Sequence, residues 1–490
     1  MTTPAYPDPI GINTETGQWG SDDGSSAWHR APHLKGELRL ALEDRQNAAH
    51  DQGNIATIEP AAILLPKDPS DVGAMVTFCH QWGIQIAPRG AGHTSFGQSL
   101  VSGVLIDMRP LNRILAADER FVEAEGGAPL GDIVAAGLVH DVRVRTGVPS
   151  ILRLTIGGVL SVGGISTLRD QGGLVDAVEE LDVVTGTGKT LTCSLHENVE
   201  LFHAVLGGLG QFGIITRVRL AMVPVPPLVR SYTFRYEHQD LRDALNDQRI
   251  LSDHPGIDET LIRWAQQESG PPIAELGVGI YYHPQTPPNE QELFQALSRA
   301  PIRTADMTYW ERAESVDKRY IGYEAQGWSR TTKVWADNFL PDRSSTAPIT
   351  DSSKVFEELV RKVLEELTER DWSSTSPVLL FRKHRGTFQR RSFRLPDAAL
   401  GEHVCLFDIS SDSFGKTIDE SYVPELMARN RRWYEQARQA GGTLYPIGAT
   451  QFDASDWEHH YGSEYFAELK RLKAKYDPGN VLTPGPGIFS

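Results

Sequence analysis

Residues 88–94 of this 490-residue chain read Pro-Arg-Gly-Ala-Gly-His-Thr, and this stretch says more about the fold than any other. Its glycines let the backbone approach a ligand closely and adopt positive φ angles, which a Cβ atom would resist. Successive free N–H groups in such a turn form a concave nest that suits a pyrophosphate. The imidazole of His93 then stands at the edge of that nest. The stretch favours a phosphate-binding loop that ends in a nucleophile; the alternative is a glycine-rich hairpin turn with an incidental surface histidine.

The segments on either side of this loop alternate between strand and helix patterns. Short apolar strands are expected at residues 61–66, 84–88 and 103–108. Between the first two, a helix begins at Asp68, where Asp and Pro occupy positions that helix starts favour, and it ends near Trp82. Strand, helix, strand, glycine loop and strand together form an α/β module.

A second set of glycine-rich segments follows between Phe121 and Met222, and it includes Gly-Leu-Gly-Gln-Phe-Gly at residues 208–213. A dinucleotide-binding GxGxxG motif needs a strand before it and a helix after it. Here the order is reversed, because residues 201–205 look helical and residues 214–222 look like a strand. We therefore reject a Rossmann interpretation of this motif.

The chain changes character after the proline-rich residues 224–227. Alternating runs at residues 231–236 and 276–282 predict strands of a sheet. Amphipathic helices are expected at residues 37–47, 356–370 and 423–440, and a final helix at 464–475. Residues 1–35 are polar and rich in Gly, Ser and Pro, which predicts an arm without a core of its own.

The composition restricts the partners. Lys and Arg total 48 and Asp and Glu total 64, so the formal net charge is −16, which repels nucleic acid and anionic membranes. No apolar stretch approaches the length of a membrane span, and the first residues lack the basic-then-apolar layout of a signal peptide. A cytoplasmic location, without nucleic-acid or membrane partners, is therefore expected, while the oligomeric state stays open.

The residue types that bind metals do not predict a metal site here. Cys79, Cys193 and Cys405 are odd in number and widely spaced, which argues against both a disulfide framework and a metal site. The close set Glu-His-His at residues 458–460 lies in a helical stretch, where adjacent histidines point in different directions and rarely share an ion. We expect this set to lie at the surface.

The glycine loop at residues 88–94 resembles the flavin-attachment motif of the vanillyl-alcohol-oxidase-like flavoproteins, in which a histidine carries FAD. The similarity is strongest to the cytokinin dehydrogenases and their bacterial relatives, and it extends from about Ala61 to the end of the chain. Besides the loop, the segments that carry it are residues 154–161, 180–186, 204–217, 335–341, 376–380 and 475–489. In the middle third the likeness is sparse.

This resemblance implies an α+β protein with two domains: an α/β FAD-binding domain of the PCMH type, and a substrate domain with an antiparallel sheet and flanking helices. The expected division is an N-terminal arm at residues 1–35, the FAD-binding domain at 36–225, the substrate domain at 226–442, and a C-terminal segment at 443–490 that returns to the FAD-binding domain.

The resemblance also implies FAD attached covalently through His93 by an 8α-histidyl bond. Attachment through His93 alone is expected, because residues 150–155, before the second glycine pair, contain no cysteine for a second bond. The other residues expected at the cofactor are Pro88, Arg89, Gly90, Ala91, Gly92, Thr94, Gln98, Ser99, Thr155, Gly157, Gly158, Ser161, Ile165, Ile214, Ile215 and Thr483.

The chain departs from the family at the catalytic base. In the cytokinin dehydrogenases, an Asp just before the second flavin segment takes a proton from the substrate amine. The corresponding residue here is Ser150, whose hydroxyl is a poor base near neutral pH. A family Asn and a family Gln are likewise replaced, by Val162 and Pro486. These three changes argue against a cytokinin as the substrate and leave the flavin site largely intact.

Four side chains remain as candidates on the substrate side. Asp337 takes the place of a family Asn and could supply the missing carboxylate, unless it is a solvated strand residue. Trp335 would stack on a flat substrate, and its alternative is a core tryptophan. Asp170 follows Arg169, and such a pair is usually structural, whereas Tyr445 could orient a substrate or simply pack.

The resemblance therefore predicts an enzyme, an FAD-dependent oxidase or dehydrogenase. A hydride would leave a C–N or C–O carbon of a small substrate of the secondary-metabolite type, and the electrons would pass to O2 or another acceptor. The cofactor would carry the hard chemistry while the protein supplies orientation and electrostatics. Two alternatives are a cytokinin dehydrogenase that cleaves N6-isoprenoid adenines, and a flavin-binding protein without turnover.

Overall fold

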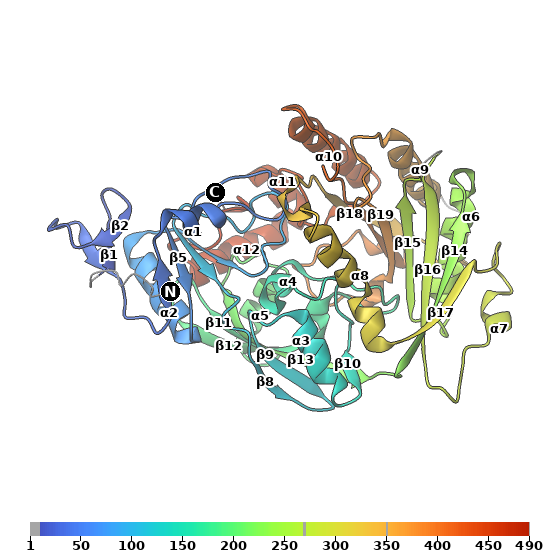
Figure 1. The fold of residues 1–490 in the computed structure, drawn as a ribbon, viewed down its shortest axis with the longest axis horizontal. Coiled ribbons are helices and arrows are strands. Elements are labelled where there is room, and N and C mark those ends of the chain that lie inside the picture. The colour runs from blue at the N-terminus through green and yellow to red at the C-terminus, as the bar shows by residue number, and fades with distance from the viewer. Residues whose placement is uncertain (1–9, 268–270, 349–350, 490) are drawn as a thin grey trace.

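The computed structural model describes residues 10–267, 271–348 and 351–489. Within these residues the strands form four sheets, and Figure 1 shows them in two main bodies with a small N-terminal sheet at one end. The first body contains the blue and green part of the chain, and the second contains a large antiparallel sheet. This α+β architecture with two domains confirms the predicted fold class.

The first domain begins with a small sheet of order β4-β5-β7-β6, in which β5, β7 and β6 run parallel. Asp68 caps helix α2 (Pro69–Trp82) by accepting a hydrogen bond from the backbone N–H of Ser70, and Gly83 ends the helix with a φ of 65°. The predicted helix and the three predicted strands are confirmed as α2, β5 (Ala62–Leu65), β6 (Ile86–Arg89) and β7 (Val104–Asp107).

One prediction for the N-terminal part, the helix, is wrong, and the structure adds a sheet that the sequence did not predict. The helix expected at residues 37–47 is strand β4 (Glu37–Arg39) followed by the short helix α1 (Leu42–Asn47), because β4 pairs with β5. Residues 1–9 lie outside the described part, but the rest of the expected arm contains an antiparallel sheet of β1 (Ile10–Asn13), β2 (Gln18–Ser21) and β3 (Trp28–Arg30). Ile12 is buried, and His29 stacks on Trp82 of α2, so a few apolar and aromatic side chains outweigh the polar composition.

The second part of the first domain is a six-stranded sheet of order β12-β11-β13-β9-β8, with β10 beside β13. Its strands are β8 (Ile114–Ala117), β9 (Phe121–Glu125), β10 (Val142–Val144), β11 (Val178–Val184), β12 (Thr190–Ser194) and β13 (Ile214–Pro224). Helices α3 (Leu130–Leu138), α4 (Ile156–Val162) and α5 (Val199–Val205) pack against it. Because α5 precedes residues 208–213 and β13 follows them, the rejection of a Rossmann motif is confirmed.

The second domain is built on an antiparallel sheet of order β17-β14-β16-β15-β19-β20-β18-β21. Its strands are β14 (Leu228–Tyr236), β15 (Glu259–Ala265), β16 (Ile273–Tyr282), β17 (Arg303–Thr308), β18 (Ala336–Asp342), β19 (Val378–His384), β20 (His403–Ile409) and β21 (Thr443–Leu444). The predicted strands at residues 231–236 and 276–282 are confirmed within β14 and β16. The change of sheet between β13 and β14 falls at the proline-rich residues 224–227.

Helices α6 (Leu241–Asp253), α9 (Asp351–Glu366) and α10 (Tyr422–Gln439) share one hydrophobic core with this sheet and cover one of its faces. Two of them confirm predicted helices, although α9 ends earlier than expected. Helix α8 (Tyr309–Glu324) crosses the middle of the molecule in Figure 1, and the short helix α7 (Glu290–Phe294) lies near the edge strand β17.

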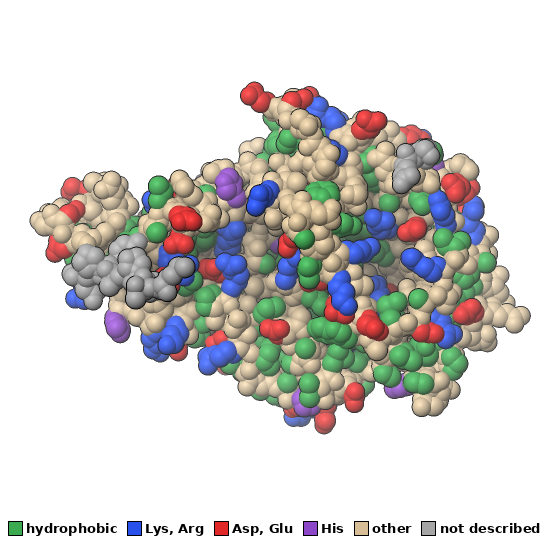
Figure 2. All heavy atoms as spheres, viewed as in Figure 1, with side chains coloured by type: hydrophobic (Ala, Val, Ile, Leu, Met, Phe, Trp, Pro, Cys, Tyr) green, Lys and Arg blue, Asp and Glu red, His purple; other side chains and the backbone are tan. Residues whose placement is uncertain are grey.

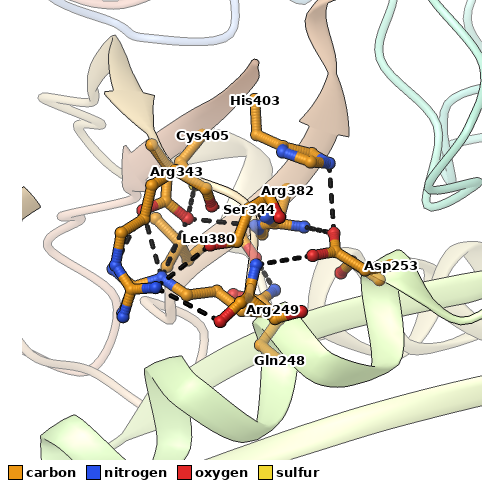
Figure 3. A network of polar contacts seen from close by, with 12 residues as sticks. Gln248, Arg249, Asp253, Arg343, Ser344, Leu380, Arg382, His403 and Cys405 are labelled. Atoms are coloured by element: carbon orange, nitrogen blue, oxygen red, sulfur yellow. Dashed lines mark hydrogen bonds and ion pairs between the residues drawn. The ribbon is translucent and has the colours of Figure 1, made fainter. Parts of the chain in front are cut away.

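A buried ionic network fastens α6 to the covered face of the sheet (Figure 3). The carboxylate of Asp342 accepts hydrogen bonds from Arg249 of α6 and from Arg382 of β19, at 2.9 and 3.0 Å, and all three side chains are 1% exposed. Arg382 also binds Asp253 at 2.9 Å. Each of these charges has a partner, which is the condition under which a buried ion pair is tolerated.

The C-terminal part returns to the first domain after helices α11 (Ala454–Tyr461) and α12 (Ser463–Tyr476). The backbone N–H of Thr483 donates to the carbonyl of Ile86 in β6, and the N–H of Ile86 donates to the carbonyl of Val481, both at 2.8 Å. The tail therefore continues the sheet edge that leads into the glycine loop.

The surface expectation for residues 458–460 is wrong for one residue. His460 is buried in α11 among aromatic rings, including Trp457 and Tyr461, because it falls on the helix face that packs inward. Within the described ranges no group of three or more His, Cys, Asp or Glu side chains is arranged to hold a metal ion. None of the helices described has both the length and the apolar character needed to cross a membrane.

Candidate active site

One cavity lies between the two domains, and every residue that the sequence assigns to the cofactor lines it. These residues are Pro88, Arg89, Gly90, Ala91, Gly92, His93, Thr94, Gln98, Ser99, Thr155, Gly157, Gly158, Ser161, Ile165, Ile214, Ile215 and Thr483. They come from β6 and the loop after it, from α4 and the residues next to it, from the start of β13, and from the C-terminal tail. Segments far apart in the sequence therefore meet at one hollow.

The glycine loop approaches α4 so closely that a side chain at Gly90 has no room. A Cβ atom there would lie 1.8 Å from Oγ1 of Thr155, which is shorter than any real contact. Gly92 has a φ of 69°, a left-handed conformation that favours glycine. The Arg89 guanidinium holds the loop from behind by donating to the carbonyls of Ala48 and His50, at 2.8 and 2.6 Å.

His93 presents an unpaired nitrogen in this cavity. The side chain is half-buried, and its Nε2 atom is buried without a hydrogen-bond partner among the described residues. Burial, followed by the charge of Arg153, lowers the pKa of His93 to about 4, so the imidazole is neutral and nucleophilic near neutral pH. Its ring lies 5.3 Å from the ring of Trp335, between centroids.

The second domain contributes one face of its sheet to the cavity. Alternate residues of each strand line it, which are Leu261 and Arg263 of β15, Leu379 and Phe381 of β19, Leu406 and Asp408 of β20, and Asp337 of β18. Successive side chains of a strand point to opposite faces, so this set is the face opposite to α6 and α9.

The register of the sheet arranges four of these residues in a single row. Arg263 pairs with Leu379, Leu379 pairs with Asp408, and Asp408 pairs with Asp337. An apolar residue thus separates a guanidinium at one end of the row from two neighbouring carboxyl groups at the other. We call Asp337 and Asp408 the carboxyl pair.

Both members of the carboxyl pair resist ionisation. Burial and the neighbouring Asp408 raise the pKa of Asp337 well above its usual value of 3.8. Burial raises the pKa of Asp408 to about 7, although a hydrogen bond from the Ser410 hydroxyl opposes this. Asp337 is 1% exposed, and its Oδ2 atom has no hydrogen-bond partner among the described residues. Two like charges this close cannot both form easily, so the pair keeps a proton near neutral pH.

Tyr445 connects the carboxyl pair with the first domain. Its backbone N–H donates to the carbonyl of Asp337 at 3.0 Å, and its hydroxyl oxygen accepts from the N–H of Gly164 at 3.2 Å. The ring packs on Phe339 and Phe393, with centroids 5.6 and 5.7 Å away. Burial raises the pKa of Tyr445, so the hydroxyl stays protonated.

Of the catalytic candidates Asp337, Tyr445 and Asp170, and of Ser150 at the family's base position, all but Asp170 line the cavity. Trp335, the residue predicted to contact the substrate, lines it as well. Asp170 is exposed and lines a separate polar depression. Its neighbour Arg169 donates to the carbonyls of Ile257 and Ser252 and thereby joins the two domains, a structural role.

Sequence reasoning missed Asp408, Arg263 and Arg319, which all line the cavity. The sequence did contain a sign of Asp408, because it is the single acidic residue in the apolar strand β20. One face of that strand packs against a core, whereas its other face can carry a polar side chain. Arg319 lies on the α8 face that also carries Val316, Tyr320 and Tyr323, with helical spacing.

Comparisons with known proteins agree with this geometry. The family described as "FAD binding domain" matches residues 60–194, and the family described as "Cytokinin dehydrogenase 1, FAD and cytokinin binding" matches residues 263–489. The chain is 30% identical to cytokinin dehydrogenase 4 of Oryza sativa subsp. japonica, over 93% of this chain and 91% of that one. It is 28% identical to an uncharacterized oxidoreductase, ORF5 in the fasciation locus of Rhodococcoides fascians, over 90% of this chain and 96% of that one.

Among solved structures, 6-hydroxy-D-nicotine oxidase from Arthrobacter nicotinovorans has the same fold, with a TM-score of 0.71 and 21% identity over 93% of this chain and 98% of that one. The fold and the family matches define the class: a two-domain FAD-dependent oxidoreductase. Within that class, the chain belongs to the cytokinin dehydrogenase family.

The residues of the cavity fit FAD. The close backbone approach at Gly90 and the left-handed Gly92 leave N–H groups of the loop free to face a pyrophosphate, which side chains would block. The unpaired Nε2 of His93 is a buried polar atom that needs a partner. Ile214 and Ile215 supply backbone and apolar surface at the start of β13.

Proposed function

We propose that this protein oxidises a carbon that bears nitrogen or oxygen in a small molecule, and that the carboxyl pair handles the proton of the substrate's N–H or O–H group. FAD, when bound, supplies the two-electron acceptor, and O2 or another small molecule takes the electrons afterwards. The observation that carries this proposal is a pair of buried carboxyl groups in the same cavity as the glycine loops and His93.

The pair suits a general base that works near neutral pH. A base is most effective when its pKa lies near the working pH, and burial brings Asp408 into that range. Asp337 carries an unpaired Oδ2 atom, so a substrate N–H or O–H group would satisfy a buried acceptor. Because the two carboxyl groups interact strongly, they bind and release the proton as a pair, and the role of base belongs to both.

Two aromatic residues would position the substrate. Trp335 is 6% exposed, and its indole Nε1 has no hydrogen-bond partner within the described part of the chain, so a substrate acceptor could bind there while a flat ring stacks on the indole. Tyr445 holds the backbone of Asp337 against the first domain and acts as a positioning residue. The hydroxyl of Ser150, where the family has its Asp, is a further polar group in the wall.

We further propose that His93 holds FAD covalently. Support comes from a neutral imidazole whose Nε2 is unpaired and whose loop is fixed by Asp51, which accepts hydrogen bonds from the Thr94 hydroxyl and the Gly97 N–H at 2.8 and 2.6 Å. A tether of this kind would prevent loss of the cofactor. Oxidation by O2 rather than by another acceptor is part of the same proposal.

A cytokinin dehydrogenase activity is the second candidate, and family membership favours it. The relative from Oryza sativa is named a cytokinin dehydrogenase, whereas this chain has Ser150, Val162 and Pro486 at three family positions and a carboxyl pair on β18 and β20. We therefore place an amine or alcohol of another kind first and an N6-isoprenoid adenine second.

The testing experiment is an anaerobic screen of the FAD-loaded protein. Small amines, alcohols and N6-isoprenoid adenines are added one at a time, and loss of the flavin absorption band is followed, with peroxide measured after air is admitted. Bleaching by amines or alcohols supports the first candidate, and bleaching by the adenines alone supports the second. A flavin that no compound of either class bleaches would contradict both.

A further inference from the structure

The cavity has two arginines at the end away from the carboxyl pair. Arg263 of β15 is half-buried and lies in the same sheet row, and Arg319 of α8 is exposed beside the same cavity. Neither guanidinium forms a hydrogen bond or an ion pair with a described residue. We call these two residues the guanidinium pair. By contrast, Arg249 and Arg382, which are buried on the other face of the sheet, are both bonded to carboxylates.

The charges nearest to Arg263 do not neutralise it. Glu275 is its register partner on β16, but the two side chains form no ion pair within the described structure. The pKa of Arg263 is lowered first by burial and next by the charge of Arg319, and the attraction of Glu275 is the smaller effect. Two guanidiniums therefore face one hollow with a repulsion that an anion between them would relieve.

The residues between the two ends are apolar. Leu379 separates Arg263 from Asp408 in the sheet row. Leu261, Phe381 and Leu406 form the apolar row beside it, and Val316 of α8 also lines the cavity. Strand β19 lies between β15 and β20, so with neighbouring strands about 4.8 Å apart the backbones of Arg263 and Asp408 are about 10 Å apart. The row thus has a cationic end, an apolar middle and an acidic end.

We infer that the substrate carries a carboxylate, which the guanidinium pair binds, joined through an apolar spacer to the carbon that is oxidised beside the carboxyl pair. The inference rests on the proposed function and names the substrate class for it: small acids with an amine or alcohol at the other end. Planar guanidinium groups bind carboxylates through paired N–H···O bonds, which gives orientation as well as affinity. Figure 2 shows several Lys and Arg side chains over the centre of this face, where α8 crosses in Figure 1, although the chain as a whole is acidic.

The test measures binding of 4-phenylbutyrate to the FAD-loaded protein by titration calorimetry. Its uncharged amide, 4-phenylbutyramide, is the matched probe without charge, and phenyl phosphate tests a different anion. The acid should bind at least about tenfold more tightly than the amide, as a charged hydrogen-bonded pair requires. Arg263→Met should abolish that preference, Arg263→Lys should keep part of it, and Arg319→Met should weaken it.

Arg235→Met is the matched control. Arg235 of β14 is the register partner of Glu275 on the side of β16 away from Arg263. It does not line the cavity, so its loss removes an equal charge without changing the proposed site. Equal binding of acid and amide, an equal loss in the Arg235 and Arg263 variants, or a preference for phenyl phosphate would overturn the inference. Arg319 lies on the surface, so Arg319→Met keeps the test decisive if Arg263→Met does not fold.

The two proposals fail in different ways. A protein that oxidises amines or alcohols but does not distinguish acid from amide would retain the proposed function and lose the carboxylate site. A protein that binds the acid through Arg263 but whose flavin no substrate bleaches would retain the site and lose the proposed reaction.

Discussion

Asp337 of β18 lies directly opposite Asp408 of β20 in the antiparallel register, and both side chains line the cavity. Like charges at opposed positions of a sheet destabilise it, and burial adds to that cost. A fold that keeps such a pair in its wall holds a group whose protonation is near balance, which is a mark of functional sites.

Removing either carboxyl group should slow turnover while FAD stays bound. We expect Asp337→Asn and Asp408→Asn to lower kcat by about 10²- to 10⁴-fold, the range for loss of a proton-transfer group. In the unchanged protein, activity should fall as the pH drops below about 7, since the pKa of Asp408 is raised to that value and the base works only when ionised. The rate measured against pH for each variant checks this.

Asp306→Asn, on the edge strand β17, is the control and should keep both the rate and its dependence on pH. An unchanged rate in both carboxyl-pair variants would rule out a role in catalysis.

The same pair should make the protein less stable as the pH rises. The pKa of Asp408 is raised from 3.8 to about 7, so between these values the folded protein binds more protons than the unfolded chain. Its stabilising effect is complete below pH 3.8 and is lost as the pH passes 7. Asp408→Asn removes this titration, so its stability relative to the unchanged protein should improve by about 3 kcal/mol between pH 5 and pH 8, because two pKa units at about 1.4 kcal/mol each separate pH 5 from the pKa of Asp408. Thermal unfolding at both pH values measures the difference, and a constant difference would mean that Asp408 does not titrate in this range.

Acid precipitation should separate covalent from dissociable FAD. In the unchanged protein the yellow colour should stay with the pellet, because a bond to the His93 Nε2 atom survives unfolding. In His93→Ala the colour should move to the supernatant, with the rest of the cavity still able to bind FAD. The matched control is His203→Ala, a histidine of α5 outside the cavity wall. Colour in the supernatant of the unchanged protein would remove the covalent bond from the proposal and leave FAD binding intact.

The buried network on the other face of the sheet should matter for stability alone. Asp342→Ala leaves the Arg249 and Arg382 guanidiniums buried without that partner, which costs about 3–5 kcal/mol in comparable cases. Below the new unfolding temperature, the FAD content should be normal, because Asp342 points away from the cavity. Glu365→Ala breaks the exposed pair with Arg361 and should change stability by less than about 0.5 kcal/mol. Denaturant unfolding of both variants gives the comparison.

The sequence was sufficient for the flavin side of the cavity because its signals are local. Glycines and a histidine within a few residues predict the loop, and the order of helix and strand around residues 208–213 excludes a Rossmann motif. The spacing of apolar residues predicted helices and strands equally well where one face of the element packs against a core, as in α2 and β14.

The substrate side could not be assembled in the same way, because its parts meet only through strand register. Nothing in the residues around Asp408 indicates that Asp337 is its neighbour, because α9 and β19 separate β18 from β20 in the sequence. A shift of one residue in pairing would turn Asp408 to the other face of the sheet. Arg319 lies on a helix whose position over the cavity depends on tertiary packing. The N-terminal sheet was missed because composition outweighed the few residues that dock it, such as His29 against Trp82.

The contact between Gly90 and Thr155 offers a direct test of the phosphate-binding loop. Gly90→Ala places a Cβ atom 1.8 Å from Thr155 Oγ1, so loop and α4 must separate, and FAD content of the purified protein should fall at least about tenfold. Thr155→Ala removes that oxygen and moves the nearest remaining Thr155 contact out to 3.0 Å, at its Cβ atom. The double variant Gly90→Ala/Thr155→Ala should therefore recover part of the FAD content that Gly90→Ala loses, which independent effects would not do. Gly415→Ala, at a left-handed turn with open space around it, controls for the cost of a Cβ atom at positive φ and should keep its FAD. If Gly90→Ala binds FAD normally, the close approach of the two segments is not what shapes the cofactor site.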